Sequence, residues 1–251
     1  MDGKKIQIPK VIHYCWFGGK ELPKEMKAYI KGWQSLCPDF EIKEWNENNF
    51  DVNSCKYIRE AYKAKKWAFV SDYARFKVLY EEGGVYFDTD VELVKPIDKI
   101  IQNGPYLGLQ CPMSVAPGLG MAMVAGNKFC QDMLEIYENS SFTDAQSSRN
   151  IKTIVDYTTE YFIPKGLRDV DEIQDINGIL IYPQRYFNPC DLETHKITIT
   201  ADTVSIHHYA GTWVDPYSAF RGKVYATLKR FGGKKLANIA RLLFGRKVKK
   251  L

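Results

Sequence analysis

Hydrophobic and polar positions along the chain alternate between helical and strand-like spacing. From Trp67 to Tyr80, large apolar side chains recur at steps of three and four residues, which predicts an amphipathic helix. Short apolar or alternating runs predict strands at residues 10–17, 40–45, 85–87, 91–94, 106–110, 121–125, 178–182 and 203–207. Further helical patterns cover residues 23–36, 54–65, 127–137 and 151–162, with Asn127 as an N-cap. This alternation predicts an α/β domain with a mostly parallel central sheet and helices on both faces. Ligands are then expected at the carboxyl ends of its strands.

Two carboxylates follow the predicted strand 85–87 directly. Gly83 and Gly84 can end the preceding helix and turn the chain back, so the strand delivers Asp88 and Asp90 to its end. Like charges this close resist burial unless a cation lies between them. Mn²⁺ and Mg²⁺ bind such oxygen ligands and keep positions open for phosphate oxygens. The pattern therefore predicts a metal–diphosphate site at a strand end, as a nucleotide-sugar transferase requires.

A second pair of charges lies on the helix that precedes this strand. Asp72 and Arg75 are three residues apart and share one helical face. An exposed pair at this spacing is ordinarily a weak surface salt bridge. The large apolar residues around this pair favour a buried pair instead.

Three blocks of the sequence occur in the order IPKVIHYCWFGG, SDYARFKVLYEEGGVYFDTD and HHYAGTW. Together they resemble family 32 glycosyltransferases, in which such blocks have the same order. The central block is the most specific and is similar to the sugar-binding region of the family, and the other two resemble its first strand and closing motif. The family includes bacterial capsular-polysaccharide transferases, fungal mannosyltransferases and, more distantly, the glucosyltransferase domain of large clostridial toxins. The resemblance implies a GT-A-type domain that transfers a hexose, with retention of configuration and with Mn²⁺ or Mg²⁺, from a UDP-sugar. The implied acceptor is a saccharide, such as a lipid-linked capsule or polysaccharide repeat unit.

The resemblance also implies roles for individual residues. Trp16 would stack on the nucleotide base, with Ser71 and Tyr86 near the ribose and Trp213 donating to the diphosphate. As catalytic and metal-binding residues it implies Asp72 and Arg75, which grip the donor, and Asp88, Asp90, His208 and Thr212, which hold the metal. The family often has Ser where Thr212 stands. We expect front-face attack in which a diphosphate oxygen takes the acceptor proton, and acceptor contacts from residues 112–120 and 140–149.

Length and composition fit one enzyme domain followed by a basic tail. The 251 residues are 45% hydrophobic, and no run approaches 18 uninterrupted apolar residues, so we expect no transmembrane helix. The N-terminus lacks the pattern of a secretory signal, and the six cysteines lack CxxC spacing, so we expect reduced cytosolic thiols. We expect a catalytic domain over residues 1–215 and basic amphipathic helices over residues 216–251.

The charge is concentrated at the end of the chain. Residues 221–251 contain eleven Lys or Arg and no Asp or Glu, whereas the first 220 residues carry 24 basic and 30 acidic residues. A basic amphipathic helix binds an anionic membrane surface, and residues 234–251 have this pattern. We therefore expect a cytoplasmic protein peripheral to the inner face of a bacterial plasma membrane. No nucleic-acid module or interleaved aromatic pattern favours nucleic acid as a partner.

Other functions of a D-x-D motif remain open from the residues alone. An aspartyl phosphatase also places two aspartates at a strand end, but Glu92 stands where such enzymes usually carry Thr or Val. A glycoside hydrolase needs two carboxylates that flank a glycosidic bond, whereas Asp88 and Asp90 are better placed to share a cation. The third alternative is a sugar- or metal-binding module without catalysis.

Overall fold

The computed structural model describes residues 7–143, 152–191 and 196–210. The chain divides into two compact units, one formed by Met1–Cys190 with Thr198–His208 and the other by Asp191–Ile197 with Tyr209–Leu251. In the second unit, the described residues are Asp191, Lys196, Ile197, Tyr209 and Ala210, and the Asp191 backbone N–H donates to the Lys196 carbonyl. The expected basic helices at 216–251 lie outside the described residues, and the predicted domain boundary at residue 215 stays a prediction.

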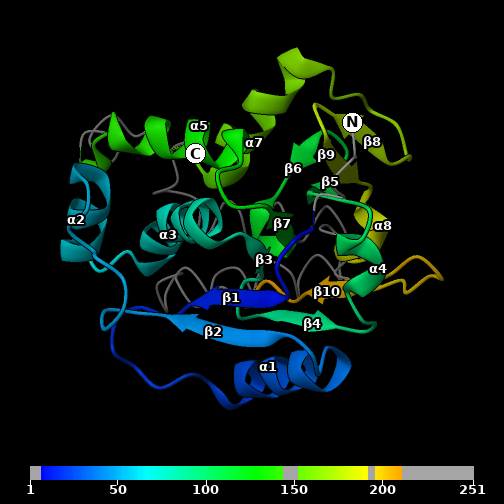
Figure 1. The fold of residues 1–251 in the computed structure, drawn as a ribbon, viewed down its shortest axis with the longest axis horizontal. Helices are drawn as coiled ribbons and strands as arrows, with labels where there is room; N and C mark the ends of the chain where they lie inside the picture. The colour runs from blue at the N-terminus through cyan, green and yellow to red at the C-terminus, as the bar shows by residue number, and fades with distance from the viewer. Residues whose placement is uncertain (1–6, 144–151, 192–195, 211–251) are drawn as a thin grey trace, which may run out of the picture. The chain divides into compact units, whose positions relative to one another are not determined.

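A central sheet runs through the first unit in the order β2-β1-β3-β7-β5-β9-β8, with β6 paired to β5 (Figure 1). Its strands are β1 (Val11–Cys15), β2 (Glu41–Trp45), β3 (Gly84–Tyr86), β5 (Tyr106–Cys111), β6 (Ser114–Val115), β7 (Met121–Met123), β8 (Gln174–Ile176) and β9 (Ile179–Tyr182). A separate ribbon pairs β4 (Val91–Leu93) with β10 (Ser205–His207) in antiparallel register. The α/β class predicted from the periodicity is confirmed.

The sheet is mixed, although the sequence predicted a mostly parallel one. The pairs β1–β2, β1–β3 and β5–β9 are parallel, whereas β3–β7, β5–β7 and β8–β9 are antiparallel. The difference arises because β5 returns through β6 and a 3₁₀ turn, Pro117–Leu119, so β7 enters between β3 and β5 without a crossover helix. The turn from β8 to β9 uses Asn177 and Gly178, both at positive φ, which is typical of a tight hairpin.

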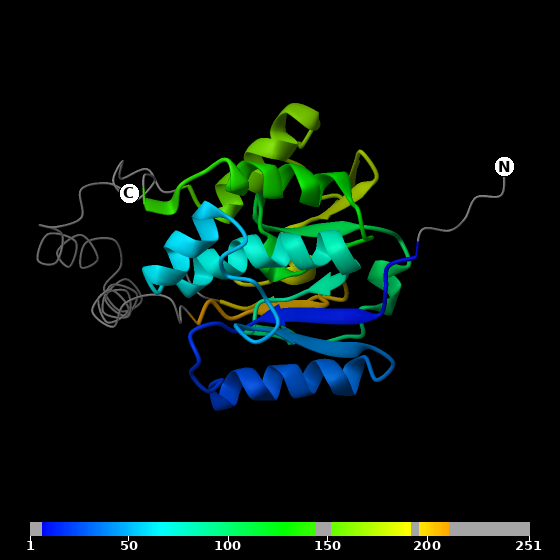
Figure 2. The same cartoon turned by 60° about the vertical axis from the view of Figure 1, so that its left-hand side comes forward.

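Helices cover both faces of the sheet. The elements are α1 (Lys24–Leu36), α2 (Lys56–Lys63), α3 (Trp67–Glu82), α4 (Asp98–Ile101), α5 (Lys128–Glu138), α7 (Ile154–Phe162) and α8 (Gln184–Phe187). Figure 2 shows α1 on one side of the sheet and α3 with α5 on the other. The Asn127 side chain accepts from the Phe129 N–H, which confirms the predicted cap of α5. No described helix is long and apolar enough to cross a membrane.

Alternation along the strands divides the core into two layers. In β1, Cys15 belongs to the layer under α2, α3, α5 and α7, while Ile12 and Tyr14 belong to the layer that includes Trp33 of α1. In β3, Tyr86 belongs to the first of these layers and Val85 to the second.

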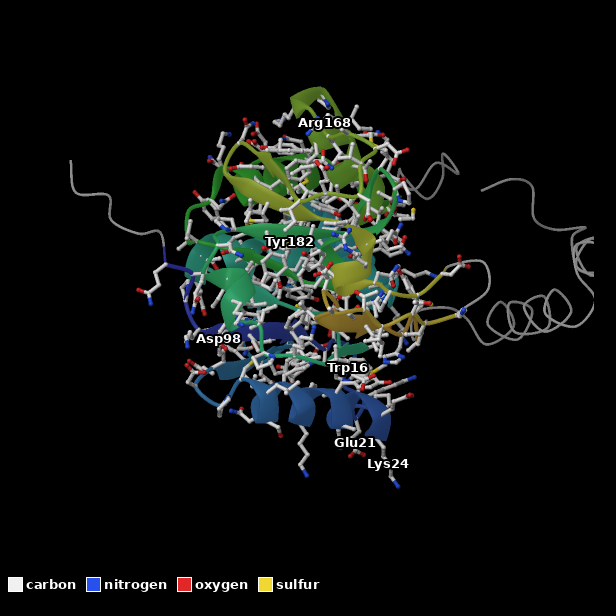
Figure 3. All side chains as sticks on the ribbon, turned by 90° about the vertical axis from the view of Figure 1, so that its right-hand side faces the viewer. Trp16, Glu21, Lys24, Asp98, Arg168 and Tyr182 are labelled. Atoms are coloured by element: carbon white, nitrogen blue, oxygen red, sulfur yellow. The ribbon has the colours of Figure 1, made fainter. Side chains whose placement is uncertain are left out.

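The two ends of the central strands carry different kinds of residues. Lys10, just before β1, forms an ion pair with Asp98, whereas Trp16 directly follows the other end of β1. Figure 3 labels Asp98 and Trp16 near these opposite ends. Because β3 runs parallel to β1, the D-x-D carboxylates that follow β3 lie at the same end of the sheet as Trp16.

Candidate active site

Two glycines place the D-x-D motif at the end of the central sheet. Helix α3 ends at Gly83 with φ of 68°, and Gly84 follows with φ of 104°. A Cβ on Gly84 would lie 2.8 Å from the Val11 carbonyl oxygen and 2.9 Å from His13 Nε2, so no side chain fits there. The chain can thus turn sharply into β3, between β1 and β7, and Asp88 follows two residues after the strand ends.

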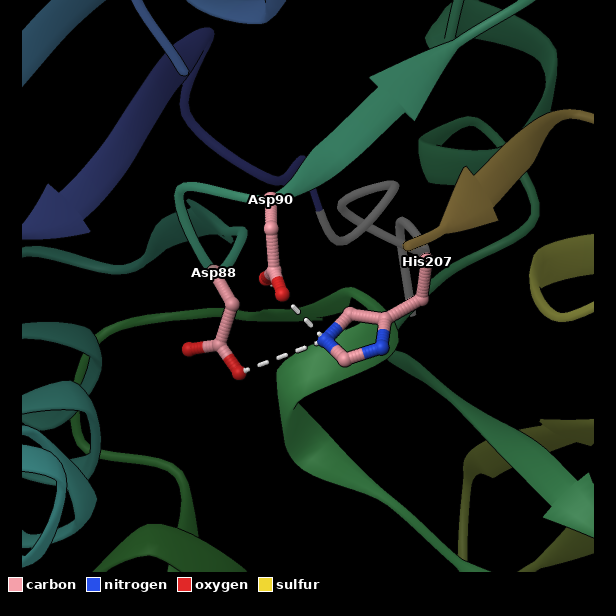
Figure 4. A group of neighbouring side chains, drawn as sticks. All are labelled: Asp88, Asp90 and His207. Carbon is pink, nitrogen blue, oxygen red and sulfur yellow. Dashed lines mark ion pairs between the residues drawn. The ribbon is translucent and has the colours of Figure 1, made fainter. Parts of the chain in front are cut away.

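Asp88, Asp90 and His207 form a group of possible metal ligands (Figure 4). One ligand atom from each lies within 4.8 Å of the others. His207 Nε2 is 3.2 Å from Asp90 Oδ1 and 3.8 Å from Asp88 Oδ2. The two aspartates lie on the turn between β3 and β4, and the histidine ends β10, which pairs with β4. The ribbon thus brings residues from distant parts of the sequence to one point.

The donor atoms of this group fit a divalent cation. Two carboxylates and an imidazole match the ligand preference of Mn²⁺, and an octahedral ion has further positions for water or phosphate oxygens. Burial lowers the pKa of His207, but hydrogen bonds and charges from Asp88 and Asp90 outweigh burial and raise that pKa to about 9. The surroundings of the imidazole therefore favour a positive charge at this point, which a metal ion would supply.

A buried arginine connects the helix α3 to the metal group. Arg75 Nη2 lies 2.9 Å from Asp72 Oδ1 and 3.2 Å from Asp88 Oδ1, and its side chain is only 4% exposed. Tyr86 Oη donates to the same Asp88 oxygen at 3.1 Å, and the Arg75 guanidinium lies 4.7 Å from the Tyr86 ring. Burial raises the pKa of Asp72 to about 7, with the Arg75 charge opposing that rise. The sequence prediction that this pair is buried is confirmed.

The structure places His207, and not His208, among the possible metal ligands, although the sequence resemblance implied His208 as the ligand. His208 Nε2 lies 2.8 Å from Glu92 Oε2, and its ring stacks on Tyr29 of α1. Neighbouring residues of an extended chain point to opposite sides, so only one of two adjacent histidines can face the aspartates. Here that residue is His207. The register of β10 on β4 makes this choice, and the sequence alone does not state that register.

Four further residues of the expected site were predicted to contact the donor or the metal. Trp16 is half-buried, and its indole N–H donates to the Lys20 carbonyl at 2.5 Å. The Ser71 hydroxyl donates to the Trp67 carbonyl one turn earlier in α3, at 3.1 Å. Thr212 and Trp213 lie outside the described residues. The roles of all four toward a nucleotide stay predictions.

Gly118 belongs to the site and was not singled out by the sequence patterns. The Asp88 backbone N–H donates to the Gly118 carbonyl at 3.2 Å. A Cβ at Gly118 would lie 2.1 Å from Asp88 Oδ2 and 3.2 Å from Arg75 Nη1. The only available signal was its position in the Gly- and Pro-rich segment 112–120, for which acceptor contact was expected. The segment supports the D-x-D turn directly, and its contact with an acceptor stays a prediction.

The sequence is similar to those of known glycosyltransferases. Residues 23–107 match the family described as "Glycosyltransferase sugar-binding region containing DXD motif". "Uncharacterized glycosyltransferase L373" of Acanthamoeba polyphaga mimivirus is 23% identical over 203 residues, which cover 75% of this chain and 76% of the relative. "Inositol phosphoceramide mannosyltransferase 3" of Schizosaccharomyces pombe is 24% identical over 55% of this chain, and the match spans 38% of that relative. A solved structure, "PaToxG Glycosyltransferase", aligns with a TM-score of 0.48 and 17% identity over 62% of this chain and 69% of its own.

The matched sequences and the α/β fold support a glycosyltransferase as the class of this protein. Within that class, the matched segment contains α3, Asp88 and Asp90, and it supports the family whose sugar-binding region carries the DXD motif. The bacterial capsular type and the likeness to large clostridial toxins stay predictions.

Proposed function

We propose that this protein transfers a hexose from a nucleotide sugar, with a UDP-hexose as the expected donor, to a saccharide acceptor in the presence of Mn²⁺ or Mg²⁺. The observation that carries the proposal is the convergence of Asp88, Asp90 and His207 within 4.8 Å, next to the buried Arg75. A glycosyltransferase that uses a nucleotide donor must neutralise the charge that develops on the leaving diphosphate. A cationic side chain beside a divalent-metal site provides this neutralisation.

The residues of the site divide this chemistry between them. Asp88, Asp90 and His207 would hold the cation, which when bound withdraws charge from the leaving diphosphate. Arg75 is fixed by Asp72 and Asp88, so its guanidinium is preorganised and needs little rearrangement to meet a phosphate oxygen. Asp72 offers a carboxylate of the kind that accepts hydrogen bonds from sugar hydroxyls. The same ion pair thus orients both parts of the proposed donor.

The stereochemistry and the acceptor follow from the resemblance of the sequence. We propose retention at the anomeric carbon, with front-face attack by the acceptor hydroxyl and transfer of its proton to a diphosphate oxygen. The acceptor would be a saccharide, such as a lipid-linked capsule or polysaccharide repeat unit. Two of the relatives are named "Inositol phosphoceramide mannosyltransferase", and another is named "Initiation-specific alpha-1,6-mannosyltransferase". Mannose donors therefore belong in any test of specificity.

Donor hydrolysis tests the proposal. The protein is incubated with a panel of UDP- and GDP-sugars, including mannose and glucose donors, and nucleotide release is followed with Mn²⁺, with Mg²⁺ and with EDTA. We expect release from one donor that requires the metal and is lost in Asp90→Asn. Asp169→Asn, at an exposed position outside the site, is the matched control and should behave as the unmodified protein. Metal-independent release, or equal release by Asp90→Asn, would contradict the proposal.

We further propose that residues 234–251, which lie outside the described part of the chain, hold the enzyme at the inner face of a bacterial plasma membrane. The support is their basic amphipathic sequence, because each cation near anionic headgroups contributes about 1 kcal/mol of attraction. Co-sedimentation with vesicles that contain phosphatidylglycerol should be lost when residues 234–251 are removed. Vesicles of phosphatidylcholine alone are the control, and equal binding to both would contradict an electrostatic attachment.

A further inference from the structure

His208 is held from three directions at the edge of the metal group. Its ring lies parallel to Tyr29 of α1, with 4.8 Å between centroids and 3° between planes. Its Nε2 lies 2.8 Å from Glu92 Oε2 in β4. Its backbone N–H donates to the Asp90 carbonyl at 3.0 Å. The residue next to the metal-facing histidine is therefore fixed by a helix, by a strand and by the D-x-D turn itself.

The backbone contact extends the β4–β10 ribbon by one step toward the carboxylates. Within the ribbon, His207 lies opposite Val91 and Ile206 lies opposite Glu92. The additional bond from His208 to Asp90 continues this pairing onto the turn that carries both aspartates. The position of the His207 backbone relative to Asp90 thus depends on how firmly the end of β10 is held.

Helix α1 contacts the same turn and ribbon at two further points. Trp33 Nε1 donates to the Val91 carbonyl at 2.8 Å, and the Thr89 hydroxyl lies 3.4 Å from the Met26 sulfur. Met26, Tyr29 and Trp33 are spaced by three and four residues, so they lie along one face of α1. Figure 1 shows α1, β4 and β10 beside one another. One helical face therefore touches the D-x-D turn, the strand after it and the histidine pair.

We propose that Tyr29, His208 and Glu92 form a clamp that positions His207 and Asp90 for a divalent cation. These three are positioning residues, because none of them belongs to the Asp88, Asp90 and His207 group itself. The inference rests on the proposed metal-dependent function and adds residues that act through the metal ligands. Residues that orient metal ligands commonly change metal affinity by 10–100-fold when they are replaced. A clamp of this kind explains why a stacked ring pair occurs beside the site.

Direct measurement of Mn²⁺ affinity tests the clamp without any donor. Mn²⁺ is titrated into the full-length protein and the free ion is followed by electron paramagnetic resonance. We expect Tyr29→Leu and His208→Leu to weaken Mn²⁺ binding by about 10-fold or more. The conservative Tyr29→Phe keeps the stacked ring and loses only the hydroxyl contact with Glu25, so it should retain the affinity that Tyr29→Leu loses. Glu92→Gln provides a milder change if a leucine variant does not fold, and it should weaken binding in the same direction.

A control separates positioning from general destabilisation. Tyr161→Leu removes an aromatic side chain from α7, away from the metal group, and should lower stability while leaving Mn²⁺ affinity unchanged. The clamp would be overturned if folded Tyr29→Leu bound Mn²⁺ as tightly as the unmodified protein, or if Tyr29→Phe lost as much Mn²⁺ affinity as Tyr29→Leu. It would also be overturned if the unmodified protein bound no Mn²⁺. Because the Mn²⁺ titration contains no donor, the clamp can affect metal binding even if donor hydrolysis fails. Conversely, donor hydrolysis can succeed even if the clamp variants bind Mn²⁺ as the unmodified protein does.

Discussion

A single methyl group at Gly118 should disturb the metal group through Asp88. The ideal Cβ of an alanine there would lie 2.1 Å from Asp88 Oδ2, 3.0 Å from its Cγ and 3.2 Å from Arg75 Nη1. Ordinary contacts between such atoms are about 3.5 Å, so the carboxylate oxygen must move by about 1.4 Å. It is not free to do so, because its other oxygen is bound by Tyr86 and Arg75. The φ of Gly118 does not lie in the positive region, so the clash is the main cost of the substitution.

The expected cost of Gly118→Ala has two measurable parts. Overpacking of this kind lowers the free energy of unfolding by about 1–3 kcal/mol, which urea denaturation followed by circular dichroism would show. Displacement of a metal ligand should weaken Mn²⁺ binding by about 10–100-fold, measured by titration calorimetry. Gly32→Ala is the matched control, since nothing lies within 4 Å of its Cβ and it sits inside α1. That change should stabilise the helix by about 0.5–1 kcal/mol and leave metal binding unchanged. Unaltered Mn²⁺ affinity in folded Gly118→Ala would refute the proposed link between this segment and Asp88.

Three further substitutions probe the framework around the site. Arg75→Met leaves buried Asp72 without its ion-pair partner, and urea denaturation should show a loss of about 3–5 kcal/mol; a loss below 1 kcal/mol would contradict a tightly coupled pair. Asn127→Ala removes the cap of α5, and the same assay should show a loss of about 1 kcal/mol with no change in Mn²⁺ affinity. Burial lowers the pKa of His13 below 6.5, so below that pH the unfolded chain takes up a proton that the folded chain resists. Stability should therefore fall with decreasing pH by up to about 1.4 kcal/mol per unit, and comparison of unfolding at pH 5 and 7.5 should show a weaker pH dependence in His13→Gln.

The local pattern of the chain predicted those parts of the site that depend on neighbouring residues in the sequence. The helical period from Trp67 to Tyr80 matches α3, and Gly83 and Gly84 mark its end. Asp72 and Arg75 lie on one helix, and Asp88 and Asp90 lie on the turn after the strand that follows it, so their approximate placement follows from local geometry.

Features that depend on distant pairing could not be predicted in the same way. The choice between His207 and His208 is made by the register of β10 on β4, and a shift of one residue would exchange the two side chains. The antiparallel entry of β7 depends on a short return from β5 where a crossover helix was expected. The role of Gly118 appears only when its carbonyl is seen to accept from the Asp88 N–H. In each case the sequence contains the residues, but tertiary contacts select their partners.

The β4–β10 ribbon has a consequence for the order in which this protein acquires its metal group during synthesis. The side-chain contact between Glu92 and His208 joins residues separated by 116 positions, so it closes a long loop. Contacts of such sequence separation form late, because the entropy of loop closure opposes them. A nascent chain that has emerged only as far as β9 would carry both aspartates but not the imidazole. We expect high-affinity metal binding to appear only once β10 has paired with β4, so the ion would stabilise folded molecules in preference to partly folded ones.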